Sequence, residues 1–589
     1  MATFETGISA LEIRRRPLPE QCTLPQSLDP VLRRVYAARG LHSAGELELG
    51  LAALASPSLR GLEAACQLLA AMLERDASIL VVGDFDADGA TGCAVAVRGL
   101  RALGARRVDY LVPDRFAFGY GLSPEIVRLA AERQPQLLVT VDNGIASHAG
   151  VETARGLGLP VLVTDHHLPG DRLPGAAAIV NPNQPDCPFP SKHLAGVGVM
   201  FYLLLALRAH LRRSGWFQRR GIPEPRLAEL LDLVALGTVA DLVPLDHNNR
   251  ILVEQGLRRM RAGVAAPGIQ ALAQVAGRDP RALVAADLGF ALAPRLNAAG
   301  RLVDMSQGVE CLLSDDPAAA LRLAQELDAL NRERRLLQAH MEAQAEAAVA
   351  GLAHDAAGTA LPQGLCLYDP SWHLGIVGLV AARIRERTQR PVVALAPDRE
   401  GWLKGSARSV PGLHLRDTLA DVAARHPGLL QRFGGHAMAA GLSLAAGSLE
   451  AFARAFDQAV RERRGTAPVG AVLWSDGSLG EAELVLETAA ALRQAGPWGQ
   501  GFPEPIFDDH FELLDRRVVG ERHLKLTLRR LGAPRPLSAI AFGAAEHYCG
   551  TERVELRVAY RLDLNHYRGL RSLQLMVEHL QPEPQVAPL

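Results

Sequence analysis

Three aspartates at alternating positions follow a short apolar run early in the chain. Ile79 to Val82 has the composition of a buried parallel strand, and Asp84, Asp86 and Asp88 come after it. Carboxylates crowded in this way repel one another, and a divalent cation relieves the repulsion because it prefers oxygen ligands. A solvated acidic turn or a helix N-cap is the alternative, and it suits one aspartate better than three. The spacing therefore indicates a metal-binding loop at the carboxyl end of a strand.

Two further apolar runs also end in polar side chains. Leu137 to Val141 is followed by Asp142-Asn143-Gly144, and Val161 to Thr164 by Asp165-His166-His167. Because the carboxyl ends of parallel strands meet at one edge of a sheet, these groups can converge with the acidic loop. The first tripeptide alone would be a common turn. Adjacent imidazoles beside an aspartate favour metal ligation in which the aspartate is the orienting partner. One core histidine and one exposed histidine are the structural alternative.

Asp241 lies near the end of a strongly apolar helical pattern, Leu227 to Val243. Burying a carboxylate in such surroundings is costly without a partner, and either a metal ion or an arginine would supply one. Asp241 is therefore a candidate last ligand, with helix capping or simple ion pairing as the alternative.

Several arginines are placed to bind phosphate. Arg295 and Arg301 flank Asn297 in the stretch PRLNAAGR, and Arg115 follows a predicted strand in PDRFAFGYG. A guanidinium can hold a phosphate through two parallel hydrogen bonds. Surface ion pairs are an equally good explanation of each arginine taken alone.

A second candidate phosphate site lies in the latter half of the chain. Ser406 and Arg408 occur in GWLKGSARS, and Gly434, Gly435 and His436 follow in RFGGHAMAAGLS. Small residues in such a loop permit a close approach of the backbone to a phosphate. Helix termination would explain the two glycines but not the whole cluster.

The composition bounds the class of protein. A chain of 589 residues needs several cores, and 48% hydrophobic with 22% charged residues is typical of globular proteins. The 63 basic and 64 acidic residues balance, so a nucleic-acid site must be a local patch. Seven scattered cysteines without a CxxC pair, and no evident signal peptide, favour a cytoplasmic protein with free thiols and no membrane span.

The alternation of strands with helices predicts an α/β protein with a parallel sheet, and the pattern changes twice after it. Residues 317–352 form one long helical pattern, expected to connect two lobes. Near the end, His523 to Arg530 and Val554 to Asn565 alternate apolar and polar residues, which predicts a β domain. With its basic residues, and with Phe502, Phe507 and Phe511 before them, this domain suits a barrel that stacks bases. A purely structural β cap is the alternative.

The stretches GDFDADG, VDNG, TDHH and GTVADLVPL occur in this order along the chain. Together they resemble the four motifs of the DHH phosphoesterase superfamily, and the length and later motifs resemble its bacterial RecJ branch from about residue 50 onward. The resemblance implies an exonuclease specific for single-stranded DNA. Such an enzyme would degrade DNA 5′→3′ to mononucleotides in recombination and repair, using two divalent cations, Mn²⁺ or Mg²⁺.

The resemblance also implies roles for particular residues. Asp84 is a further acidic member of the first motif, and His167 lies beside the metal ligands or faces the substrate. Arg115 and Arg301 would hold a 5′-terminal phosphate, and Ser406, Arg408 and His436 would contact the scissile or terminal phosphate. The residues that match the metal ligands are Asp86, Asp88, Asp142, His166 and Asp241.

These patterns divide the chain into five parts. We expect a lead-in at residues 1–50, a DHH catalytic domain at 51–315 and a connecting helix at 316–355. A DHH-associated substrate-binding domain at 356–468 and an oligonucleotide-binding (OB) fold at 469–589 complete the chain. The expected partner is single-stranded DNA, with a single-stranded-DNA-binding protein and a helicase as candidate protein partners of a monomer. Two alternatives remain: a phosphodiesterase for short oligonucleotides or cyclic dinucleotides, and a non-catalytic single-strand-binding protein.

Overall fold

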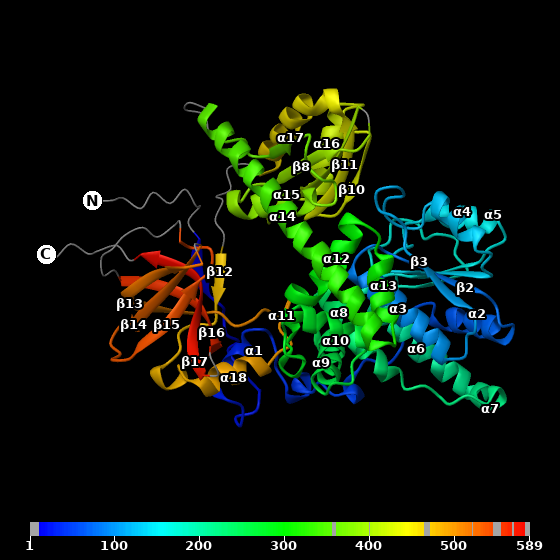
Figure 1. Ribbon diagram of the computed structural model, residues 1–589, viewed down its shortest axis with the longest axis horizontal. Helices are drawn as coiled ribbons and strands as arrows, with labels where there is room; N and C mark the ends of the chain where they lie inside the picture. Colours follow the sequence, from blue (N-terminus) through cyan, green and yellow to red (C-terminus); the bar gives the residue numbers. More distant parts are fainter. Residues whose placement is uncertain are drawn as a thin grey trace. The chain divides into compact units, whose positions relative to one another are not determined.

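The computed structural model describes residues 11–355, 361–399, 401–464, 472–520, 522–545, 555–567 and 570–582 (Figure 1). The described residues fall into two compact units. The larger unit contains residues 16–331 and those from 476 onward, and the smaller unit contains residues 11–15 and 332–475. Each unit has its own sheets and its own apolar core, so the two are taken in turn.

The larger unit is built around a five-stranded parallel sheet with strand order β3-β2-β4-β5-β6. Every residue of β2, β4 and β5 is buried, as expected of aliphatic strands covered on both faces. Helices α2, α3 and α6 contribute to one apolar cluster and α4 and α5 to another, on opposite faces. The strands are β2 (Ile79–Gly83), β3 (Val108–Leu111), β4 (Leu137–Val141), β5 (Val161–Thr164) and β6 (Ala178–Val180). The helices are α2 (Leu62–Glu74), α3 (Ala87–Ala102), α4 (Pro124–Glu132), α5 (His148–Gly156) and α6 (Gly196–Arg213).

Helix α8 (Leu231–Ala240) is the buried centre of the helices that follow the sheet. It packs against α3, α6 and α9, and its residues 231–238 are all buried. The apolar pattern at residues 227–243 begins as a 3₁₀ turn (Leu227–Leu230) and becomes α-helical only afterwards. The neighbouring helices are α7 (Trp216–Arg220), α9 (His247–Arg261), α10 (Pro267–Val275), α11 (Ala285–Asp287), α12 (Ala293–Leu302) and α13 (Ser306–Leu313).

The predicted long helix is present as α14 (Pro317–Asp355), and the boundary between the two units lies within it. The smaller unit contains a mixed sheet of order β10-β11-β9-β8-β7, and Phe452 and Phe456 of α17 fill its core. Its strands are β7 (Leu365–Tyr368), β8 (Val392–Pro397), β9 (Trp402–Arg408), β10 (Arg432–Gly435) and β11 (Ala439–Ala445). Its helices are α15 (Val377–Thr388), α16 (Leu415–Arg425) and α17 (Leu449–Arg464).

A closed barrel of order β13-β14-β15-β17-β16 forms the C-terminal part of the larger unit and confirms the predicted β domain. Phe502, Phe507 and Phe511 are at most 4% exposed, because side chains that point into a small barrel or its base form the core. The prediction that they stack bases is therefore wrong. The strands are β13 (Phe507–Val519), β14 (His523–Arg530), β15 (Pro536–Ala541), β16 (Glu555–Tyr567) and β17 (Leu570–Pro582), preceded by helix α18 (Leu486–Gln494). Val554, where a strand was expected to begin, lies outside the described residues.

The segment before the barrel is integrated into the larger unit. The guanidinium of Arg39 binds Asp476 at 2.8 Å, and both side chains are only 1% exposed. The Tyr36 hydroxyl donates to the Ala495 carbonyl at 2.7 Å, and Arg250 lies 4.4 Å above the centre of the Phe502 ring. Removing this segment would therefore open the core of the unit.

The lead-in contains regular structure. Strand β1 (Glu12–Arg15) pairs in parallel with β12 (Val472–Ser475), and helix α1 (Pro30–Ala37) is capped by the side chain of Asp29. Residues 1–10, and 356–360 at the expected junction after the long helix, lie outside the described part of the chain. In that part, no helix combines the length and the apolar character required to cross a membrane.

Candidate metal centre

The acidic loop joins β2 to α3 and is fixed by backbone hydrogen bonds. The carboxylate of Asp86 caps α3 by accepting from the Gly89 N–H at 3.0 Å, so the predicted N-cap alternative is true of this residue. Asp88 is 1% exposed and accepts from the Gly196 and Val197 N–H groups, at 2.6 and 2.9 Å, at the start of α6. A side chain at Gly89 would lie 2.4 Å from the Asp84 carbonyl oxygen, which explains the glycine.

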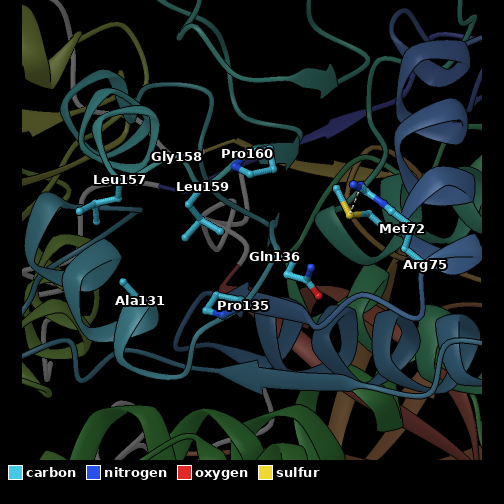
Figure 2. Close-up of a pocket in the computed structure, with 9 residues that line it drawn as sticks. All are labelled: Met72, Arg75, Ala131, Pro135, Gln136, Leu157, Gly158, Leu159 and Pro160. Carbon is cyan, nitrogen blue, oxygen red and sulfur yellow. Dashed lines mark hydrogen bonds between the residues drawn. The ribbon is translucent and has the colours of Figure 1, made fainter.

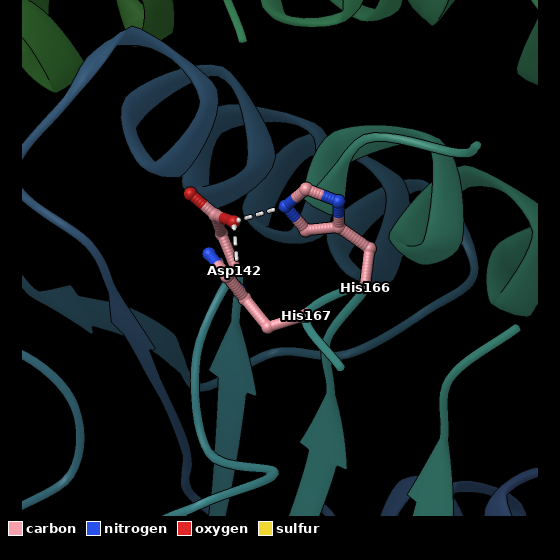
Figure 3. A group of neighbouring side chains, drawn as sticks. All are labelled: Asp142, His166 and His167. Atoms are coloured by element: carbon pink, nitrogen blue, oxygen red, sulfur yellow. Dashed lines mark ion pairs between the residues drawn. The ribbon is translucent and has the colours of Figure 1, made fainter. Parts of the chain in front are cut away.

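Asp142 and His166 meet at the carboxyl ends of β4 and β5 (Figure 3). The His166 Nε2 atom lies 3.1 Å from Asp142 Oδ1 and 3.4 Å from Asp241 Oδ2, which comes from the end of α8. These three atoms are buried, and none makes a hydrogen bond within the described residues. Buried polar atoms are almost always satisfied, so three unsatisfied atoms that converge indicate a site for a cation.

The predicted ligands, together with Asp84 and His167, form sets with suitable spacing. Within each set, one ligand atom per residue lies within 4.8 Å of the others. Two of the sets share no residue, so the cluster can offer three ligands to each of two cations. Carboxylate oxygens with one imidazole nitrogen suit Mn²⁺ or Mg²⁺. The sets are Asp84, Asp86 and Asp142; Asp88, His166 and Asp241; and Asp142, His166 and His167.

The electrostatics of the cluster agree with a cation site. Burial and the charge of Asp86 raise the pKa of Asp88 to about 7, and burial with neighbouring carboxylates raises the pKa of Asp142 and Asp241 well above the ordinary value. Burial lowers the pKa of His166 to about 4, so its imidazole is neutral and available as a ligand. The protein thus concentrates negative charge that bound cations would neutralise without protonation of the carboxylates.

Stability without metal should therefore fall as the pH rises from about 6.5 to 8. The raised pKa of Asp88 means that the folded state holds a proton that the unfolded state loses near pH 4, so this contribution disappears through pH 7. His166 has the opposite sign, because its pKa is about 4 in the folded state and about 6.5 in the unfolded state. Most of this gain in stability lies below pH 6.5, and only a small remainder opposes the fall. Melting temperatures in EDTA should be lower at pH 8 than at pH 6.5, with a smaller difference in Mn²⁺ and in Asp88→Asn. A melting temperature in EDTA that rises over this interval would contradict the assignment.

Asp165 and Tyr120 hold His167. The structure confirms Asp165 as the predicted orienting partner of an imidazole, whereas the sequence did not identify Tyr120 as a site residue. Asp165 accepts from the His167 ring Nδ1 at 2.7 Å and from the Ile145 N–H at 2.9 Å. Although burial alone would lower the pKa of His167, the hydrogen bond and charge of Asp165 raise it. The Tyr120 hydroxyl lies 3.1 Å from His167 Nδ1 and donates to the Asp142 carbonyl at 3.2 Å. The position of Tyr120 after a predicted strand, in FGYG, was the available signal.

Three of the four predicted phosphate-binding residues on this unit lie beside the acidic loop. The Arg115 guanidinium sits 4.5 Å above the centre of the Phe85 ring, and the Asn297 side chain accepts from the Ala87 N–H at 2.9 Å. Arg301 follows Gly300, which packs so tightly on Phe85 that a side chain there would lie 1.8 Å from the Phe85 carbonyl oxygen.

Arg295 is placed differently from the other three. Its guanidinium pairs with Asp328 of α14 at 2.8 Å and also donates to the Ala291 carbonyl oxygen. Its predicted contact with phosphate stays a prediction.

The second predicted phosphate site assembles within the smaller unit. Strand β11 pairs with both β9 and β10, so Gly441 lies opposite Ser406 on one side and Gly434 on the other. The Arg408 guanidinium donates to the Ser406 hydroxyl at 2.7 Å.

The loop after β10 and the start of α15 complete this assembly. The His436 N–H donates to the Ala439 carbonyl at 2.8 Å and closes the turn, where Gly435 has φ +143°. A side chain at Gly378, in the first turn of α15, would lie 3.0 Å from the Arg408 guanidinium, so a helix N-terminus lies against this pair. Helix N-termini and arginines both favour anions.

A cavity of about 440 Å³ lies at the opposite edge of the parallel sheet (Figure 2). Gln136 and Pro160, which line it, come directly before β4 and β5, whereas the metal cluster follows the carboxyl ends of these strands. Leu157, 55% exposed, also lines the cavity. The cavity is therefore separate from the candidate metal centre.

A parallel sheet with carboxylates and an imidazole converging at its carboxyl edge defines a metal-dependent phosphoesterase of the DHH class. The family models agree: the DHH family N-terminal domain matches residues 78–238, the DHHA1 domain 361–462 and the RecJ OB domain 475–579. The chain is 55% identical to the single-stranded-DNA-specific exonuclease RecJ of Dickeya dadantii and 54% identical to that of Escherichia coli K12. Each match covers 97% of this chain and 99% of the relative. The chain belongs to the RecJ family of exonucleases.

Solved structures of the family contain the cations that the composition of the cluster favours. RecJ of Thermus thermophilus in complex with Mn²⁺ superposes with a TM-score of 0.79 at 32% identity, over 98% of this chain and 80% of that one. The same protein in complex with Mg²⁺ gives a TM-score of 0.72 at 29% identity, over 98% and 79%.

Proposed function

We propose that this chain degrades single-stranded DNA from the 5′ end to mononucleotides by two-metal-ion hydrolysis, in recombination and repair. The observation that carries the proposal is the convergence of the unsatisfied atoms Asp142 Oδ1, His166 Nε2 and Asp241 Oδ2. The membership of the RecJ family, whose relatives are named for single-stranded DNA, supports the choice of substrate.

The residues of the cluster have separable tasks. When bound, two cations would supply positive charge for the phosphodiester and an activated water. His167 can carry a proton and donate to a phosphate oxygen, since Asp165 raises its pKa. Arg115 is held on the Phe85 ring, where it can meet a terminal phosphate without first being ordered. The ligands that would hold the cations are Asp86, Asp88, Asp142, His166 and Asp241, with Asp84 beside them.

A nuclease assay with purified protein tests the proposal directly. Single-stranded and duplex DNA labelled at either end would be incubated with Mn²⁺, Mg²⁺ or EDTA. We expect metal-dependent release of mononucleotides from the 5′ end of the single strand and little attack on the duplex. Cleavage of cyclic dinucleotides in preference to long strands would support the alternative phosphodiesterase, and binding without hydrolysis would support the non-catalytic alternative.

The barrel is proposed to bind the strand beyond the metal centre. Arg517 on β13 lies opposite Lys525 on β14, and within the described residues neither side chain makes an ion pair. Arg529 and Arg530 of the same basic stretch are instead paired with Glu512 and Asp509. Arg517 and Lys525 are therefore the stronger candidates for phosphate contacts.

Replacing Arg517 and Lys525 together with alanine should weaken binding to long single strands and flatten its salt dependence. Each lost phosphate contact lowers the slope of log K against log salt by about 0.7 for a single strand, so the double variant should lose about 1.4. Fluorescence anisotropy over a salt series measures the slope. The control removes the same charge with Arg128→Ala and Arg155→Ala, exposed residues on α4 and α5. Equal slopes for the two double variants would show that the barrel has another task.

The proposal extends to the setting of the reaction. We infer a monomer in the cytoplasm that acts with a single-stranded-DNA-binding protein and with a helicase that exposes single strands. The cysteines at positions 22, 66, 93, 187, 311 and 366 are free thiols, which supports a reducing compartment. Light scattering of the purified chain tests the monomer.

A further inference from the structure

Phe290 is the most exposed large apolar residue of the described chain, at 85%. It lies in a π-helical segment, Leu288–Leu292, between α11 and α12. Its neighbours Leu288, Ala291 and Leu292 are buried, so the segment is anchored in the core and turns one aromatic ring outward. Segments of π-helix are rare and frequently occur at functional sites.

The π-helical segment is held in place by polar contacts as well as by packing. The Arg295 guanidinium donates to the Ala291 carbonyl oxygen and pairs with Asp328, and these two side chains are only 14% and 12% exposed. An ion pair so nearly buried fixes the backbone next to Phe290. The backbone that holds the Phe290 ring, residues 288–292, is therefore fixed in position; we call this segment the support.

This support is joined to the metal cluster at two points. Gly289 lies against Val239, since a side chain at Gly289 would be 3.3 Å from the Val239 Cγ1 atom, and Val239 comes two residues before Asp241. Farther along α12, Asn297 accepts from the Ala87 N–H in the acidic loop at 2.9 Å. Asn297 comes seven residues after Phe290, which corresponds to about 10 Å along a helix. This distance is roughly the length of three stacked nucleotides.

A second exposed apolar side chain lies at the same end of α8. Leu242 directly follows the ligand Asp241, is 70% exposed and has φ +59°. A leucine in the left-handed region is strained, and such strain is concentrated at functional sites. Leu242 therefore places an exposed apolar side chain directly beside the candidate ligand Asp241.

We propose that Phe290, together with Leu242, is the surface on which bases of the single strand stack next to the metal cluster. The inference rests on the proposed function. It says which residues contact the bases, whereas the cations and the arginines of the proposed function contact the phosphates. Every base has an apolar face, so stacking on an aromatic ring is strong and tolerant of sequence. Phe290 is a positioning residue, because it would hold the strand without touching the scissile phosphate.

The test measures binding of a 12-nucleotide single strand in EDTA by fluorescence anisotropy. Phe290→Ala should lower the affinity about tenfold, and Phe290→Trp should restore it, with the new tryptophan quenched when DNA binds. Leu157→Ala, an exposed leucine at the opposite edge of the sheet, is the matched control and should bind like the parent chain. Strands with one abasic nucleotide at successive positions then locate the contact. The penalty of Phe290→Ala should vanish at one or two adjacent positions.

Two results would overturn the stacking surface. The first is equal affinity of Phe290→Ala and the parent chain for the intact strand. The second is a penalty that persists at every abasic position, since that would reflect a change of structure. If the parent chain fails to hydrolyse single-stranded DNA with Mn²⁺, the proposed function itself is wrong. If it hydrolyses the strand while Phe290→Ala binds normally, only the stacking surface is wrong.

Discussion

Asp142→Asn should lower hydrolysis of single-stranded DNA by about a thousandfold or more while the protein stays folded. Asp142 is 2% exposed, and its Oδ1 atom lies 3.1 Å from His166 Nε2 at the centre of the cluster. Asparagine keeps the shape but removes the charge that a cation requires. It is also the better choice than alanine, because Asp142 has φ +64° and asparagine tolerates the left-handed region.

The same variant should be as stable as the parent chain, or more stable, when metal is removed. Burial and the charges of Asp88, Asp86 and Asp241 raise the pKa of Asp142, so a neutral side chain relieves repulsion in the folded state. Melting temperatures in EDTA and rates with Mn²⁺ measure the two effects separately. Asp109→Asn, on the exposed side of β3, is the matched control and should leave both unchanged. Near-normal turnover in Asp142→Asn would rule out the metal assignment.

Arg301→Ala should reduce activity on 5′-phosphorylated strands by roughly tenfold to a hundredfold and on 5′-hydroxyl strands much less. Arg301 follows Gly300, the point at which α12 packs against the acidic loop. A terminal phosphate carries nearly two negative charges, and losing a charged hydrogen-bond partner costs about 1.5–3 kcal/mol. The ratio of kcat/KM on the two substrates measures the preference.

Two further variants sharpen this prediction. Arg301→Lys keeps the charge but loses the two-pronged geometry, so it should recover only part of the preference. Arg155→Ala, an exposed arginine paired with Glu152 on α5, should leave the ratio unchanged. Equal losses by Arg301→Ala on both substrates, or release of nucleotides first from the 3′ end, would show that the residue does not read the 5′ terminus.

Local patterns along the chain were sufficient to predict many of the strands of this protein and where their polar ends meet. The aliphatic runs before Gly83, Asp142 and Asp165 became β2, β4 and β5, because burial on both faces demands such residues regardless of their partners. The alternation from His523 to Arg530 became β14 with the same bounds. Since parallel strands end at one edge, the convergence of their polar ends could also be predicted.

Other features depend on segments that meet only after folding. Asp88 is fixed by two N–H groups of α6, 108 and 109 residues away, and no spacing along the chain reveals that pairing. The role of Asp165 as the orienting partner of an imidazole was predicted, but only the structure shows that this imidazole is His167 and that Tyr120 also contacts it.

Which aromatic residues are exposed also could not be predicted from the sequence. The residues expected to stack bases, Phe507 and Phe511, fill the barrel, while Phe290, which no pattern marked, faces solvent. The direction of a side chain follows the local backbone. Whether the side chain is buried in the core, contacts a polar partner or faces water depends on which distant segment packs against it. That packing is determined only by the tertiary structure.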